Sequence, residues 1–476
     1  MICAVSPNAL FSATGKWLRI LGLLNRWFFA MRRGLRRRHE CEVGNGVCRF
    51  GSAVEGSNGY HYEHVQPMAV VMNGNELMQA ALGLLPPWAV DRCSFAVEAG
   101  RLDIYLDFPR GSTFACPVCA ASAKAYDTET LTWRHLNFFQ HQTYLHARTP
   151  RVECSVCGVH RVVVPWARPD SGFTLLFEAF VMQLAKVMPI SAVGRLVGEH
   201  DTLVWRIVNH YVDLARSRAD HSQVTQVGVD ETAARRGHNY ISLFVDLEER
   251  KVLFVTPGKD ARTVAAFADD LQAHKGDPEA ITEVSADMSP AFIKGITAQL
   301  PNASITFDKF HVVGLVNSAV DEVRREESRL HPELTGSRYI WLKNPNNLTA
   351  GQKDQLATFD LKRGHLKTAK AYQMRLAFQD LYNQPLELAE AYLKKWYFWA
   401  THSRIKPIIA VAKTIRRHQA GLLRWFTSKI NNGILEGINS LVQAAKAKAR
   451  GYRSNRNFAS IIYLIAGKLD LSCQPT

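Results

Sequence analysis

The sequence predicts a multidomain α/β protein, and three observations support this fold class. Two pairs of cysteines lie within residues 116–157, a helical hydrophobic periodicity follows from residue 173, and apolar strands that end in acidic residues begin near residue 223. A length of 476 residues allows about three domains. With 47% hydrophobic and 21% charged residues, the chain can bury a sizeable core, which excludes a largely disordered protein.

The net charge indicates an anionic partner. Lysine and arginine number 58 against 43 aspartate and glutamate, a formal balance of +15, which suits nucleic acid or an acidic membrane surface. The most apolar N-terminal stretch, residues 17–31, is interrupted by Arg19 and Arg26, and five arginines follow within 32–38. This stretch therefore fits neither a membrane span nor a signal peptide. We expect a cytoplasmic protein with no membrane partner.

Residues 1–72 lack a sustained helical or strand periodicity and are rich in arginine. They are either a basic arm or translated sequence upstream of the true start. A cleaner pattern begins at Met72 and continues through Asn73 and an apolar run to Leu85. The pattern favours a start at Met72.

Four cysteines form two Cys-x-x-Cys pairs, separated by 34 residues, and they predict a zinc ribbon: Cys116, Cys119, Cys154 and Cys157. Each two-residue spacing lets a tight turn present both thiolates to one ion, and two such turns complete a tetrahedral Zn²⁺ site. Gly158 follows the second pair where a positive φ is favoured, and Ala120 holds the matching place after the first. Alternating segments at 130–135 and 142–148 predict strands between the pairs. Four thiolates leave no open position, so the zinc is structural.

A helix-turn-helix is expected next. Residues 173–187 have helical periodicity, a short helix follows from Ser191, and Gly198 lies near a turn. Asp201 or Thr202 is expected to cap the next helix, whose inner stripe is Val204, Ile207 and Val208. Four side chains would then face a DNA groove: Thr202, Trp205, Arg206 and Asn209.

From residue 223 the order of elements becomes strand, strand, strand, helix, strand, helix, strand, which is the order of a ribonuclease H-like α/β fold. The first and fourth strands end in Asp230 and Asp287, and two carboxylates on adjacent central strands can share a divalent ion. Glu231 would point to the opposite face of an extended chain, which favours Asp230 as the ligand.

A third carboxylate is indicated by charge patterning. Glu436 is the single acid between Glu390 and Asp470, in a stretch that holds fifteen lysines and arginines. It lies on a predicted helix, 434–449, away from an apolar stripe formed by Ile434, Ile438, Leu441, Val442 and Ala445. Its own face is polar, with Asn432, Asn439, Ser440 and Gln443. The cations that follow are expected to bind DNA phosphates: Lys446, Lys448, Arg450 and Arg453.

Five separated motifs occur in order and carry a resemblance. They are Val-Gly-Val-Asp230-Glu, Ser-Ala-Asp287-Met-Ser, Phe-Asp308-Lys-Phe-His311, Leu-Glu436-Gly-Ile-Asn and Ala-Arg450-Gly-Tyr-Arg. Over about residues 73–470 the chain resembles bacterial insertion-sequence transposases of the ISL-three type, which have a zinc ribbon, a helix-turn-helix and a DDE catalytic domain in this order. It departs from them in Ala120, where the knuckle glycine is usual, and in the 1–72 extension.

The resemblance implies a DNA transposase that binds the ends of an insertion sequence and catalyses strand cleavage and strand transfer into target DNA. Asp230, Asp287 and Glu436 would hold two Mg²⁺ (or Mn²⁺) ions that serve both steps. Asp308 and His311 match a family motif and are expected next to the metal ligands. Double-stranded DNA is the expected partner, bound by a homodimer or higher oligomer. The alternatives are a non-catalytic DNA-binding regulator and a nuclease of the same fold.

The expected domains are a basic extension at 1–72, a zinc-ribbon domain at 73–170, a helix-turn-helix at 171–218 and a catalytic domain at 222–470. The separation of 149 residues between Asp287 and Glu436 is too long for a simple ribonuclease H core. A helical insertion is therefore expected at about 323–400. It ends in an aromatic cluster, residues 396–399, that is interpreted as core packing in preference to a platform for stacked bases.

Overall fold

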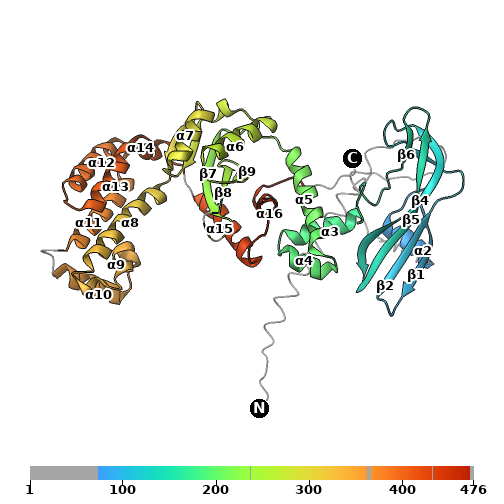
Figure 1. Ribbon diagram of the computed structural model, residues 1–476, viewed down its shortest axis with the longest axis horizontal. Helices are drawn as coiled ribbons and strands as arrows, with labels where there is room; N and C mark the ends of the chain where they lie inside the picture. The colour runs from blue at the N-terminus through green and yellow to red at the C-terminus, as the bar shows by residue number, and fades with distance from the viewer. Residues whose placement is uncertain (1–72, 236, 238, 362–365, 431–432, 472–476) are drawn as a thin grey trace, which may run out of the picture. The chain divides into compact units, whose positions relative to one another are not determined.

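The computed structural model describes residues 73–235, 237, 239–361, 366–430 and 433–471 (Figure 1). The extension expected at 1–72, with the proposed start at Met72, lies outside these residues. Within the described ranges, no helix is both long and apolar enough to cross a membrane.

The first domain is a short helix followed by a six-stranded sheet. The elements are α2 (Gly74–Leu82), β1 (Ala89–Ala96), β2 (Arg101–Asp107), β3 (Thr113–Ala115), β4 (Ser122–Phe138), β5 (His141–Cys154) and β6 (Gly158–Arg161). The strand order is β1-β2-β5-β4-β3, with β6 paired to β5, and only β2 and β5 run parallel. Strands β4 and β5 confirm the alternating segments at 130–135 and 142–148, whereas β1 and β2 were not predicted.

This sheet has a hydrophobic core of its own. Trp88, Trp133 and Trp166 are buried, and the ring of Trp166 meets those of Trp88 and Trp133 edge-on at 4.8 and 5.6 Å. Strand β2 contributes alternate buried residues, as expected for a strand with one face in the core. The cysteine pairs are therefore attached to a sheet with its own packing.

The next three helices are α3 (Leu175–Ala185), α4 (Ile190–Val197) and α5 (Asp201–Ser217). Gly198 ends α4 in the left-handed region at φ +75°, which confirms the predicted turn. Helix α5 is capped by His200, whose side chain accepts from the Thr202 amide, because Asp201 is already helical. The cap expected at Asp201 or Thr202 is thus wrong by one or two residues. The predicted inner stripe, Val204, Ile207 and Val208, is buried.

The region that follows α5 begins with a five-stranded sheet. Its strands are β7 (Gln226–Ala233), β8 (Tyr240–Asp246), β9 (Lys251–Pro257), β10 (Glu283–Ala286) and β11 (Ser304–Phe307), in the order β11-β10-β7-β8-β9. The first three form an antiparallel meander, and β10 and β11 run parallel to β7. This is the ribonuclease H-like arrangement that the sequence predicts.

Helices cover both faces of this sheet. On one face are α6 (Ala261–Ala273) and α7 (Pro290–Gln299), and on the other are α15 (Gly433–Lys448) and α16 (Asn455–Ala466) (Figure 1). Strand β8 is buried on both sides: Phe244 packs with α6, while Leu243 and Val245 pack toward α15 and α16. Side chains on a strand alternate between faces, so a central strand is apolar at nearly every position.

Between β11 and α15 the chain is helical. The helices are α8 (Lys309–Glu327), α9 (Arg338–Leu342), α10 (Ala350–Leu361), α11 (Lys367–Asp380), α12 (Leu386–Thr401), α13 (Lys406–Arg417) and α14 (Gln419–Ser428). They share one hydrophobic cluster, which runs from Phe307 to Phe426. The insertion therefore extends beyond the expected 323–400 on both sides, because α8, α13 and α14 bury their apolar faces in the same core.

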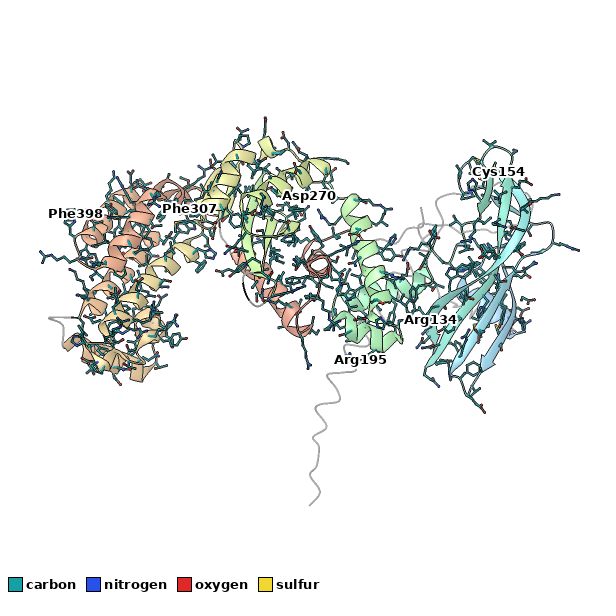
Figure 2. The ribbon with its side chains drawn as sticks, viewed as in Figure 1. Arg134, Cys154, Arg195, Asp270, Phe307 and Phe398 are labelled. Carbon is teal, nitrogen blue, oxygen red and sulfur yellow. The ribbon has the colours of Figure 1, made fainter. Side chains whose placement is uncertain are left out.

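The aromatic cluster at the end of α12 divides between core and surface. Trp396 is buried and donates its indole N–H to the Met374 carbonyl at 2.8 Å, as core packing predicts. Phe398 lies on the outer surface of the insertion, with 64% of its area exposed (Figure 2). Tyr397 packs partly against the helical core, and Trp399 is 37% exposed.

Candidate active site and DNA-binding surfaces

Three acidic residues, called the acidic rung, lie at neighbouring positions of β7 and just after β10 and β11. Strand β10 lies between β7 and β11, and its register pairs Ser285 with Gly228 on one side and with Thr306 on the other. Two positions after Gly228, Ser285 and Thr306, the sequence has an aspartate in each case: Asp230, Asp287 and Asp308. Because neighbouring strands lie about 4.8 Å apart, this register places Asp287 between the other two at the carboxyl end of the sheet.

Helix α15 docks along β7 through polar side chains. The contacts run from the amide of Asn439 to Asp230, from the amide of Gln443 to the Thr232 hydroxyl, and from the ammonium of Lys446 to the Ala233 carbonyl. Four residues of a helix span about 6 Å along its axis, and two residues of a strand span about 6.6 Å. Contacting residues on α15 and β7 are therefore spaced alike, and the polar face of α15, which includes Glu436, is turned toward the acidic rung.

Gly228 permits this close approach. A Cβ atom built there would lie 2.8 Å from side-chain atoms of both Leu435 and Leu247, closer than real Cβ atoms come. Leu435 is buried between α15 and the sheet, whereas Leu441 is 45% exposed. Leu441 was therefore wrongly assigned to the apolar stripe, because the helix turns Leu435 inward where Gly228 leaves space.

A pocket of about 440 Å³ opens between the acidic rung and α15. Its lining residues are Asp230, Asp308, Phe310, His311, Leu435, Glu436, Asn439, Ser440 and Gln443. Asp287 belongs to the same rung without lining this pocket, and among the described residues Asp230, Asp287 and Glu436 do not have ligand atoms all within 4.8 Å of one another. The pocket confirms the polar face predicted for α15 at Glu436, Asn439, Ser440 and Gln443, whereas Asn432 lies outside the described residues.

The charges around the pocket influence one another. Burial raises the pKa of Asp230, and the carboxylates of Asp308 and Asp287 add to the rise. His311 lies 2.9 Å from the Asp308 carboxylate, and this hydrogen bond, helped by the charge of Asp308 and Asp230, raises the pKa of His311 to about 9. At neutral pH the site therefore holds one imidazolium among several carboxylates.

The donor set fits hard divalent cations. Carboxylate oxygens are the ligands that Mg²⁺ prefers, and a half-buried acid whose pKa is raised by neighbouring acids is stabilised in its ionised form by a nearby cation. Asp230 is held by two donors, the Glu231 amide at 2.7 Å and Asn439. Asp287 accepts from the Ser289 amide at 2.9 Å. Both carboxylates are thus oriented by the chain.

Glu231 takes no part in the pocket. Its carboxylate lies 3.9 Å from the ammonium of Lys259, and Glu231 is not among the pocket-lining residues. Asp230 and Glu231 face opposite sides of β7, as the alternation of a strand predicts.

The four cysteines come together as predicted. Sulfur atoms of Cys116, Cys119, Cys154 and Cys157 all lie within 4.8 Å of one another, at the end of β5 near β6 (Figure 2). Ala120 has φ +60° and Gly158 has φ +85°, so the two turns share the backbone conformation that the sequence suggested. Backbone amides of Val156 and Cys157 lower the pKa of Cys154 to about 6, which favours the thiolate that binds metal.

The structure places only two of the four predicted groove-facing residues in solvent. Thr202 and Arg206 are exposed on α5. Asn209 donates to Asn457 at 3.2 Å and accepts from the Ser460 hydroxyl at 2.8 Å, so its amide is engaged by α16. Trp205 is half-buried, with its ring edge-on to Tyr452 at 6.2 Å. Residues 452–460 therefore cover part of that side of α5, and the DNA contact of Trp205 and Asn209 stays a prediction.

Two of the predicted phosphate-binding cations, Lys446 and Lys448, lie in the last turn of α15, and Arg450 and Arg453 follow that helix. Lys446 and Lys448 contact the carbonyl oxygens of Ala233 and Val187, which leaves Arg450 and Arg453 as the exposed arginines of the group. Arg450 has φ +56°, in the left-handed region just after α15 ends. The four cations thus lie on, or directly after, the helix that carries Glu436.

Asn439, Gln443 and Gly228 position α15 against β7, and these contacts were not predicted from the sequence. Asn439 and Gln443 were placed on the polar face of the helix, but nothing in the sequence pairs them with β7. A glycine inside an apolar strand is a signal for close backbone approach, and Gly228 is such a residue.

Comparison with known proteins shows the same three parts in the same order. A family model for a zinc finger of transposases IS204/IS1001/IS1096/IS1165 matches residues 112–157, and one for the helix-turn-helix of transposase family ISL3 matches 162–212. A third, the ISL3 DDE model described as transposase, matches 227–462. These matches define the chain as a transposase with a DDE catalytic domain.

The chain belongs to the ISL3 family of transposases. It is 28% identical to the transposase for insertion sequence element IS1557 of Mycobacterium tuberculosis, over 73% of this chain and 85% of that protein. It is 29% identical to the transposase for insertion sequence element IS1001 of Bordetella parapertussis, over 81% and 97%. A simian T-cell lymphotropic virus intasome bound to PP2A regulatory subunit B56 gamma includes a chain with 15% identity over 41% of this chain and 64% of its own length, at a TM-score of 0.17. The alternative of a non-catalytic regulator is not favoured by these relatives.

Proposed function

We propose that this chain binds the ends of an insertion sequence and catalyses metal-dependent strand cleavage and strand transfer, with Asp230, Asp287 and Glu436 as the ligands of two Mg²⁺ or Mn²⁺ ions. The observation that supports this proposal most is the parallel register of β7 and β10, which aligns Asp230 with Asp287. Helix α15 then presents Glu436 to the pocket that Asp230 lines.

Each residue of the site has a definable task. Such ions, when bound, lower the pKa of a water and neutralise charge that builds up on the phosphate. Asn439 fixes the carboxylate of Asp230 through its hydrogen bond, so that the acid is oriented before DNA arrives. Asp308 keeps His311 protonated, and the imidazolium is suited to pair with a phosphate of the bound strand.

The proposed chemistry consists of two in-line displacements. In the first, a water oxygen bonds to phosphorus at the element's end while the bond from phosphorus to the 3′ oxygen breaks. The 3′ oxygen takes up a proton, and a 5′ phosphate remains on the flanking strand. In the second, the freed 3′ hydroxyl loses its proton and attacks a target phosphodiester, whose own 3′ oxygen leaves. No covalent bond to the protein is required.

DNA binding is assigned to the cysteine-bearing domain, the helix-turn-helix and the exposed cations after α15. Thr202 and Arg206 are the groove-facing candidates on α5, and Arg450 and Arg453 are candidates for phosphate contacts. An element has two ends, and a homodimer or higher oligomer on DNA supplies one catalytic site to each. The cysteine group is proposed to hold a structural Zn²⁺.

The decisive experiment replaces one carboxylate at a time, as Asp230→Asn, Asp287→Asn and Glu436→Gln. Each change removes a charge with little change of shape, and each is expected to abolish both cleavage and strand transfer in Mg²⁺ while end binding persists. The losses should not add in a triple variant, because the carboxylates act as one unit. Gel assays with labelled element ends and a target plasmid measure all three activities.

Glu231→Gln is the matched control, since Glu231 neighbours Asp230 but pairs with Lys259 outside the pocket. It should cost much less activity than Asp230→Asn. Glu436→Gln protein that joins ends to target at the wild-type rate would remove Glu436 from the ligand set and make Asp308 the next candidate.

A further inference from the structure

A second group of metal-binding side chains lies where the helix-turn-helix joins the catalytic sheet. His221 is in the segment between α5 and β7, and Asp270 and His274 are at the end of α6 (Asp270 is labelled in Figure 2). A ring nitrogen of each histidine and a carboxylate oxygen of Asp270 lie within 4.8 Å of one another. None of the three lines the pocket that contains Asp230, and none belongs to the cysteine group.

His221 has an unusual environment for a polar side chain. It is 94% buried, with 6% of its area exposed, and neither ring nitrogen has a hydrogen-bond partner of regular geometry. A buried, unpaired imidazole loses its hydrogen bonds to water without replacement, which is unfavourable. A ligand that accepts the lone pair of one ring nitrogen would offset that loss.

The backbone holds His221 against its neighbours. Its amide donates to the His274 carbonyl at 2.8 Å, and the two imidazole rings lie 5.1 Å apart at an angle of 36°. The neutral imidazole is the form that binds metal ions.

His274 and Asp270 are held in place by neighbouring groups. The Nδ1 atom of His274 lies 2.6 Å from the Asp270 carbonyl oxygen and 3.4 Å from the Asp270 carboxylate. Because the carbonyl only accepts, Nδ1 carries the hydrogen and the neutral ring keeps a lone pair on Nε2. Metal-bound histidines commonly donate their other ring N–H to such a carbonyl. The Asp270 carboxylate accepts from Arg216 at 2.7 and 2.8 Å, and an ionised carboxylate has further lone pairs for an ion.

We propose that His221, Asp270 and His274 form a second zinc site, which ties the end of α5 to α6. Two imidazoles and one carboxylate are a ligand set typical of Zn²⁺, with water in the fourth position, and imidazole is a poor ligand for Mg²⁺. Zinc binds such atoms at about 2.0–2.2 Å. Small side-chain rotations are expected to bring the three ligand atoms closer to one another when the ion binds. The site lies apart from the carboxylate pocket and does not depend on the chemistry proposed there.

The experiment counts zinc in the full-length protein. The protein is equilibrated with zinc in a buffer with excess Mg²⁺, which keeps the carboxylate site occupied, and is then desalted and measured by atomic emission. Wild type should hold two zinc ions per chain, and His221→Gln and His274→Gln should each hold one. The variant with Cys116 and Cys154 both changed to Ser should also hold one. His402→Asn, at an exposed histidine after α12, is the control and should keep two.

Cobalt substitution distinguishes the two sites without any variant. The wild-type protein should bind two Co²⁺ per chain, and only one of them should show the near-ultraviolet band of thiolate ligation. One zinc per wild-type chain would overturn the proposal, as would two cobalt ions that both show thiolate ligation. Two zinc ions retained in folded His221→Gln and His274→Gln protein would overturn the assignment to these residues.

Discussion

The cysteine group and the carboxylate pocket are assembled in opposite ways. Each half of the cysteine group comes from a turn of a few residues, in which spacing alone brings two sulfur atoms together. The carboxylate pocket combines the rung of Asp230, Asp287 and Asp308 with a helix that follows more than a hundred residues later. A site of the first kind depends on local turns, and a site of the second kind depends on the whole sheet and on the docking of α15.

The largest expected effect is the loss of zinc from the cysteine group while the rest of its domain stays folded. Cys154→Ser should release one zinc per chain and unfold the two cysteine turns, because such turns depend on metal. The tryptophan core of the same sheet should stay folded, since Trp88, Trp133 and Trp166 pack without the cysteines. Metal analysis measures the first effect, and tryptophan fluorescence during thermal unfolding measures the second.

Cys93→Ser is the control for this prediction, because Cys93 is an exposed cysteine on β1 outside the group. It should keep both the zinc and the binding of element ends. Cys154→Ser, in contrast, should weaken end binding. Loss of the whole tryptophan transition in Cys154→Ser would mean that the metal, and not the apolar core, holds this domain together.

The next effect tests the docking of α15. Gly228→Ala should destabilise the protein by about 1–3 kcal/mol through overpacking, because the new methyl group meets Leu435 and Leu247. A displaced α15 also moves Glu436, so strand transfer should fall more than DNA binding does. Leu435→Ala makes room for the methyl group, and the double variant should recover part of the lost activity.

Gly314→Ala on α8 is the matched control for Gly228→Ala. A Cβ there meets no atom within 4 Å, and alanine is favoured over glycine inside a helix, so the change should stabilise by about 0.5–1 kcal/mol. If Gly228→Ala behaved in the same way, the close approach of α15 to β7 would be wrong.

The same contrast explains what could be predicted from the sequence. The cysteine group, Asp230, Asp287 and the polar face of α15 follow from local patterns: a two-residue spacing, strands that end in acids, and a helical period. The positions of Trp205 and Asn209 could not be predicted, because residues 452–460, more than two hundred positions later, cover that side of α5. Long-range packing leaves no period in the sequence.

Two further differences between prediction and structure also arise from long-range packing. Leu435 replaces Leu441 in the buried stripe because of the space at Gly228, a feature of another strand. The insertion was predicted too short because α8, α13 and α14 bury apolar residues against a core whose members are spread from Phe307 to Phe426. An amphipathic period predicts that a helix has a buried face, but it does not indicate the partner.

Smaller effects are expected on α5, and they distinguish DNA contact from packing. Arg206→Ala should weaken binding to the element's own end by about 1–3 kcal/mol if Arg206 contacts base edges, with almost no effect on random DNA. Asn209→Ala should instead lower stability by about 1 kcal/mol and leave sequence preference unchanged, because its amide bonds to Asn457 and Ser460. Competition binding with end and random duplexes, together with thermal unfolding, measures both.

Arg450→Ala provides the contrast for Arg206→Ala. Arg450 is exposed and is expected to contact phosphates, so its loss should weaken binding to both duplexes and reduce the salt dependence. Equal effects of Arg206→Ala on end and random DNA would show that Arg206 also contacts phosphate.

The smallest effect concerns the pH dependence of the Asp308–His311 pair. The pKa of His311 is raised to about 9 from an ordinary value near 6.5, chiefly by its hydrogen bond to Asp308. A raised pKa means that the folded state binds the proton more tightly, so the pair stabilises the fold fully below about pH 6.5, and this contribution is lost as the pH rises through 9. The gain is small because half of the His311 side chain faces solvent. Thermal midpoints measured from pH 6 to 10 should therefore fall slightly more for wild type than for His311→Gln, and parallel curves would show that the pair contributes nothing to stability.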